Sequence, residues 1–133
     1  MFHFFKKFAA RKWVPVTWTL ITIILLCLPG SAIPGGGLFN IPHFDKIIHI
    51  LLFGGMVWWW VLYFDSRPPR NLVPFQKILI LVCRTVVLGV ILEFVQLNFI
   101  PNRSFDRGDI YANAAGSLFA GLLAGFLPHW RLR

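Results

Sequence analysis

Four long apolar runs, separated by segments rich in proline, glycine and charged residues, divide the chain. The runs cover residues 13–28, 47–64, 78–97 and 110–127. Three of them approach the 20 or so residues that a transmembrane helix needs, and the first is shorter. The glycines and prolines between the runs stop regular elements. The pattern therefore predicts an all-α membrane protein with four transmembrane helices.

The first run and the segment after it each allow two interpretations. A basic lead, an apolar run and then Pro29-Gly-Ser-Ala32 also fit a cleaved signal peptide. Because three more apolar runs follow, an uncleaved first helix is the simpler interpretation. Segment 29–44 is apolar as well as glycine-rich, and we favour a passive linker at the membrane surface over a lid.

Composition agrees with a membrane protein. Hydrophobic residues make up 57% of the 133 residues and charged residues 14%, against about 25% charged in soluble domains. We expect one four-helix domain at 13–127, between a basic lead at 1–12 and a basic tail at 128–133. The net charge of +8 does not indicate a nucleic-acid partner, because the charges flank apolar runs. Cys27 and Cys83 fall inside the runs, where we expect them to be buried.

Basic residues predict the orientation of the four spans. One side of the membrane would hold nine of them: Lys6, Lys7, Arg11, Lys12, Arg67, Arg70, Lys77, Arg131 and Arg133. The other side would hold three: Lys46, Arg103 and Arg107. Loops on the cytoplasmic side carry the excess of Lys and Arg. Both termini are therefore expected in the cytoplasm.

Polar residues gather at the opposite, outer ends of the last three spans. They are Asp45, Lys46, His49, Glu93, Gln96, Arg103, Asp106, Asp109 and Asn113. Helical spacing places Glu93 beside Gln96, and Asp109 beside Asn113. Polar side chains in membrane helices are costly and usually line a pathway or pocket. The set predicts a ligand-binding site; the structural alternative is a network in which Arg103 neutralises two carboxylates.

Small residues explain how these polar groups meet. Ser117, Gly121 and Gly125 form a stripe at four-residue spacing on the last span, and Gly89 lies on the third. Small residues let membrane helices approach closely. In an antiparallel hairpin of these two spans, Gly89 faces the stripe. Glu93 and Gln96 then stand near Asn113 and Asp109, and we expect Arg103 and Asn113 to be the partners of Glu93.

Two motifs resemble those of the VanZ-like family. The first is Asp45-Lys46-Ile-Ile-His49, followed by Phe53. The second is Glu93-x-x-Gln96, Pro101-x-Arg103 and Asp106-x-x-Asp109-x-x-x-Asn113-x-x-Gly116. The resemblance covers about residues 45–125. It implies a small, multi-pass, four-helix protein of the bacterial cytoplasmic membrane, in a family named for a teicoplanin-resistance protein. The triple tryptophan at 58–60 and the glycine-rich segment at 29–44 are not part of the family pattern.

Two classes of function fit these residues. A binding module would hold a lipid-linked cell-wall precursor or a lipoglycopeptide antibiotic among membrane lipids, with Arg103 and Lys46 on an anionic head group. Such a module would contribute to teicoplanin-type resistance or to envelope homeostasis. No serine or cysteine sits in a nucleophile motif, which favours binding.

The alternative is a membrane-embedded hydrolase or transferase acting on a lipid-linked phosphate or ester. Its candidate catalytic residues are His49, Glu93 and Asp109. A divalent metal on Asp45, His49, Glu93 and Asp109 is conceivable, but two carboxylates and an adjacent arginine argue against a tight site. We expect no metal and no cofactor.

The charge asymmetry makes a prediction about topology. With Asn102→Cys, the new thiol should react with a membrane-impermeant reagent on intact cells. With Ser66→Cys, it should react only after lysis, because basic loops stay in the cytoplasm. Thiol labelling of whole and lysed cells measures both, and the reverse pattern would overturn the outer location of the polar site.

Overall fold

The computed structural model describes residue 8 and residues 11–32, 41–67 and 73–126. Their elements are α2 (Trp13–Leu26), the 3-10 turn η1 (Gly30–Ala32), α3 (Phe44–Asp65), α4 (Phe75–Phe99) and α5 (Arg107–Phe126). No strand occurs in these residues, so the all-α prediction is confirmed for them. Most of the basic lead, the glycine-rich part of segment 29–44 and the basic tail lie outside the described residues.

The helix ends follow from local sequence signals. Asp45 lies in the first turn of α3, where a carboxylate suits the positive end of the helix dipole. Helix α4 begins at Phe75, three residues before the predicted start, directly after Pro74, whose ψ of 147° is extended. Proline is favoured at a helix start because it has no backbone N–H to leave unpaired.

Two helices fit a membrane by length and composition. They are α3, with 22 residues, and α4, with 25. Helix α2 is apolar but has 14 residues, which span about 21 Å at 1.5 Å per residue. The described residues therefore carry two potential membrane spans, which supports association with a membrane.

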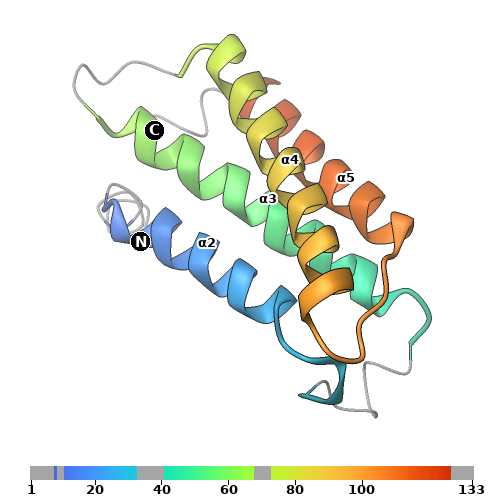
Figure 1. Cartoon of the computed structure of the whole chain (residues 1–133). Helices are drawn as coiled ribbons and strands as arrows, with labels where there is room; N and C mark the ends of the chain where they lie inside the picture. Colours follow the sequence, from blue (N-terminus) through green and yellow to red (C-terminus); the bar gives the residue numbers. More distant parts are fainter. Residues whose placement is uncertain (1–7, 9–10, 33–40, 68–72, 127–133) are drawn as a thin grey trace.

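Helix α3 forms the middle of the molecule, with α2 along one side and α5 along another (Figure 1). Its most extensive packing is against α5. A Cβ added at Gly116 of α5 would overlap the backbone of Ile50 in α3, and one added at Gly54 would lie 3.1 Å from the Gly116 carbonyl oxygen. The closest helix approach is thus α3 to α5, whereas the sequence pointed to the hairpin of α4 and α5.

The α4–α5 contact also forms, but Gly89 faces Asn113 and not the stripe of Ser117, Gly121 and Gly125. A Cβ on Gly89 would lie 2.8 Å from Asn113 Nδ2, and one on Gly121 would lie 2.6 Å from Val82 Cγ2. Around Gly121, a hydrophobic core joins α3, α4 and α5. Its buried members are Val57, Val61, Ile78, Val82, Ala120 and Ala124.

The two cysteines differ from expectation. Cys27 is half-buried and Cys83 is exposed, so the prediction that both are buried is wrong. In an apolar helix whose outer face is hydrophobic as well, hydrophobicity does not identify the inner face. Arg84, beside Cys83, is exposed too.

We predict that Gly116→Ala destabilises the protein more than Gly121→Ala. At Gly116 the new methyl group meets backbone, which cannot rotate away, and overpacking typically costs about 1–3 kcal/mol. At Gly121 it meets the end of the Val82 side chain, and the better helix propensity of alanine, about 1 kcal/mol, offsets the crowding. Thermal unfolding in detergent measures the difference, with Ala115→Leu on an exposed face as control. Equal melting temperatures for the two glycine variants would contradict the close α3–α5 contact.

Candidate functional site

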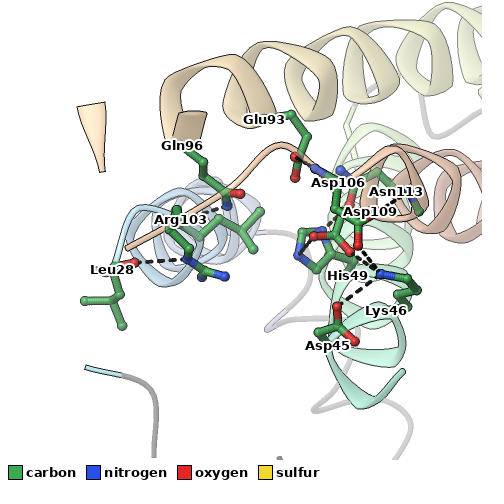
Figure 2. A network of polar contacts seen from close by, with 12 residues as sticks. Leu28, Asp45, Lys46, His49, Glu93, Gln96, Arg103, Asp106, Asp109 and Asn113 are labelled. Atoms are coloured by element: carbon green, nitrogen blue, oxygen red, sulfur yellow. Dashed lines mark hydrogen bonds and ion pairs between the residues drawn. The ribbon is translucent and has the colours of Figure 1, made fainter. Parts of the chain in front are cut away.

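Three helix ends and one loop build the polar site (Figure 2). The start of α3, the end of α4, the loop 100–106 and the start of α5 meet because consecutive helices run antiparallel (Figure 1). Each contributes part of the predicted set. The contributions are Asp45, Lys46 and His49 from α3, Glu93 and Gln96 from α4, Arg103 and Asp106 from the loop, and Asp109 and Asn113 from α5.

Lys46 is the central cation of the site. Its Nζ lies 2.6 Å from Asp106, 3.0 Å from Asp109 and 3.1 Å from Asp45. An ammonium group has three N–H donors, so these carboxylates occupy all of them. The Lys46 ammonium also holds the pKa of the Asp106 carboxyl below its usual range. This ion pair therefore stabilises the fold above the ordinary aspartate pKa and loses that effect as the pH falls through the lowered value.

Asp106 also caps helix α5. Its Oδ1 accepts a hydrogen bond from the Gly108 N–H at 2.6 Å, the arrangement of a helix N-cap. The Asp106 N–H donates in turn to Glu93 Oε2 at 3.1 Å. One residue thus fixes the start of α5 against both α3 and α4.

His49 is held by Asn113. The His49 Nδ1 and Asn113 Oδ1 atoms are 2.8 Å apart. With the amide in this orientation its oxygen can only accept, so the ring donates from Nδ1. The other ring nitrogen, Nε2, faces Asp109 Oδ2 at 3.7 Å, too far for a hydrogen bond. Asn113 Nδ2 is buried without a hydrogen-bond partner among the described residues.

Gln96 and Arg103 lie apart from this cluster and fasten the end of α2. Gln96 Nε2 donates to the Leu26 carbonyl at 2.8 Å, and Arg103 Nε donates to the Leu28 carbonyl at 3.3 Å. Figure 2 shows both on the far side of Glu93 from Lys46. The last carbonyls of a helix have no partner within it, and these side chains supply partners for two carbonyls at this end.

The structure corrects two expectations about Arg103. It does not neutralise the carboxylates, because Lys46 has that position, and it is not the partner of Glu93, which binds the Asp106 N–H. Asn113 pairs with His49 and not with Glu93. Helical spacing revealed the faces of α4 and α5 but not the path of loop 100–106.

The cluster carries an excess of negative charge. The cluster contains four carboxylates, Asp45, Glu93, Asp106 and Asp109, and one ammonium, so its formal charge is minus three when His49 is neutral. Three buried members, His49, Glu93 and Asp109, each offer a ligand atom, and these atoms lie within 4.8 Å of one another. The cluster therefore has the composition of a cation site.

Fold and site together define a small helical protein with apolar helices and a buried, acidic polar cluster at one end. An uncharacterized protein of the fission yeast Schizosaccharomyces pombe is 35% identical to this chain over 130 residues. The aligned region covers 96% of this chain and 71% of the yeast protein. The chain belongs to the family of that protein. No family model and no solved structure matches the chain.

We predict that Lys46→Gln destabilises the fold by about 2 kcal/mol. Breaking a fully buried ion pair typically costs about 3–5 kcal/mol. Because the Lys46 side chain is 25% exposed, we expect a smaller loss of stability here. The loss arises because Asp109 keeps a buried charge without its partner. Lys77→Gln, at an exposed position of α4, is the matched control and should stay within about 0.5 kcal/mol. Chemical unfolding in detergent measures both, and equal stabilities would remove Lys46 from its central position.

Proposed function

We propose that this is a multi-pass membrane protein that binds the anionic head group of a membrane amphiphile at the polar end of its bundle. In this proposal α2, α3, α4 and α5 all cross the membrane, and both termini are cytoplasmic. All four helices carry large apolar side chains on their outer surfaces, such as Ile24, Leu51, Val87 and Phe119. Lipid, and not water, is the solvent that suits such a surface.

The observation that carries the proposal is the buried polar cluster inside an apolar bundle. Glu93 is 1% exposed, His49 3% and Asp109 6%. Each charged side chain in a membrane helix costs about 2.5–3.5 kcal/mol at its centre, and less near its end. A bundle held together by apolar contacts alone would not need this set, so its cost supports a functional role for this end of the bundle.

Arg103 is the residue best suited to contact an anion. Its Nε atom binds the Leu28 carbonyl, and the terminal amino groups form no hydrogen bond within the described residues. A guanidinium group binds phosphate or carboxylate in a planar, two-point geometry. Lys46 is unsuited to the role that the sequence suggested for it, because three carboxylates occupy its donors.

The resemblance to VanZ-like proteins gains support from the same geometry. The Asp45–His49 motif and the Glu93–Gly116 motif are far apart in sequence, and most of their polar residues meet at one place (Figure 2). We therefore retain a VanZ-like protein as the proposed type. The relative in fission yeast favours a head group common to many membranes. A bacterial membrane location, and a cell-wall precursor or teicoplanin-type antibiotic as ligand, stay narrower predictions.

A second candidate is a membrane-embedded hydrolase or transferase. The observation that favours it is the orientation of His49, whose Nδ1 is fixed by Asn113 while Nε2 faces the carboxylates. A general base needs a ring held in one orientation with a free nitrogen. The substrate would be a lipid-linked phosphate or ester.

The proposed function predicts that binding of the amphiphile depends on Arg103. Full-length protein purified in mild detergent should carry an anionic amphiphile that native mass spectrometry detects. Arg103→Gln should lower its occupancy at least tenfold, because the guanidinium is the anion contact. Arg107→Gln removes the same charge at an exposed position four residues further on and should leave occupancy unchanged.

Two results would go against this assignment. Equal occupancy in both arginine variants would show that amphiphile binding does not use Arg103. Conversion of added membrane lipids to a product by the wild type, lost in His49→Gln, would favour the enzyme.

A further inference from the structure

The geometry points to a divalent metal site formed by His49, Glu93 and Asp109, which we call the triad. This inference rests on the arrangement of the triad and not on amphiphile binding. It revises the expectation, drawn from the sequence, that no metal is present. That expectation depended in part on an arginine beside the carboxylates, and Arg103 instead binds the Leu28 carbonyl.

The triad has the donor set and burial of a metal site. One residue comes from each of α3, α4 and α5, and one ligand atom from each lies within 4.8 Å of the others. An ion about 2.1 Å from each ligand holds them roughly 3–3.6 Å apart. Side-chain shifts of about 1 Å, which the long Glu93 side chain can supply, close the difference. Three protein ligands leave at least one position open.

His49 supplies an independent indication. It is 3% exposed, yet its Nε2 has no hydrogen-bond partner within the described residues and points at Asp109 Oδ2, 3.7 Å away. When Nδ1 carries the proton, Nε2 presents a lone pair to a carboxylate, which is repulsive unless a cation lies between them. The hydrogen bond from Nδ1 to Asn113 is the partner that metal-bound histidines usually have.

The charge balance favours the triad over the other acidic group. Asp45, Asp106 and Asp109 also lie close enough to share an ion, but the Lys46 ammonium already contacts all three. Glu93 has no ammonium beside it and receives one backbone N–H. A divalent ion on the triad would reduce the excess of three negative charges to one.

The donor types narrow the choice of metal. Imidazole suits Zn²⁺ and related ions, whereas carboxylates suit Mn²⁺, Mg²⁺ and Ca²⁺ as well as Zn²⁺. One imidazole with two carboxylates therefore fits Zn²⁺ or Mn²⁺ better than Ca²⁺ or Cu⁺. The open position would be available to water or to an anionic oxygen of a ligand.

The test measures metal directly, on full-length protein without added lipid. Protein stripped with EDTA is equilibrated with Zn²⁺ or Mn²⁺, and its metal content and affinity are determined by mass spectrometry of the element and by calorimetry. We expect about one ion per chain and a higher melting temperature with metal than with EDTA. His49→Gln and Glu93→Gln should each weaken binding by a hundredfold or more.

Control variants separate the triad from other ligands. Asp65→Asn removes a carboxylate at the opposite end of α3 from the triad and should leave metal affinity within twofold. Asn113→Ala, which removes the partner of His49, should weaken binding about tenfold. Wild-type protein with no bound metal and no change in melting temperature overturns the inference, as does equal binding by wild type, His49→Gln and Glu93→Gln. Because lipid is absent, these results are independent of amphiphile binding.

Discussion

The ammonium of Lys46 is the interaction on which the polar end of the molecule depends. Lys46 belongs to α3, and its ammonium reaches the loop residue Asp106 and Asp109 of α5 as well as the neighbouring Asp45. Asp106 is thereby placed to cap α5 and to donate its N–H to Glu93 of α4. A single cation thus fixes three helix ends. In an apolar bundle every polar group needs an internal partner, and this one ammonium is a partner for three carboxylates.

This interaction is possible because α3 and α5 approach closely at Gly116. The space that a Cβ would occupy there is filled by the Ile50 backbone. Ile50 directly follows His49, so the position with the closest backbone contact is next to the histidine of the cluster. A side chain at Gly116 would push α3 from α5 and lengthen the His49–Asn113 and Lys46–Asp109 contacts together. Packing and polar contacts therefore depend on each other.

Local patterns in the sequence predicted the helices and most members of the site. Apolar runs bounded by Pro29, Pro74 and Asp106 are sufficient to locate helices, and the spacing of Asp109 and Asn113 is sufficient to place them on one face. The structural alternative, in which Arg103 neutralises two carboxylates, is wrong, because Lys46 contacts the carboxylates and Arg103 contacts the Leu28 carbonyl. The position of Arg103 depends on how loop 100–106 passes the end of α2, a long-range property without periodicity. The exposure of Cys83 was not predicted, because both faces of that helix are apolar and hydrophobicity does not distinguish them.

The separation of Arg103 from the acidic cluster has a physical consequence for ligands. An anion brought next to Glu93 and Asp109 meets a net negative charge in surroundings of low dielectric constant, where repulsion is strong. An anion at Arg103 lies beside a positive guanidinium, on the far side of Glu93 from the remaining carboxylates (Figure 2), so it meets less of that repulsion. With a divalent ion on His49, Glu93 and Asp109, the cluster itself would attract an anionic oxygen at the open coordination position. One head group spanning both places would then join the guanidinium and the metal, and its affinity would depend on both.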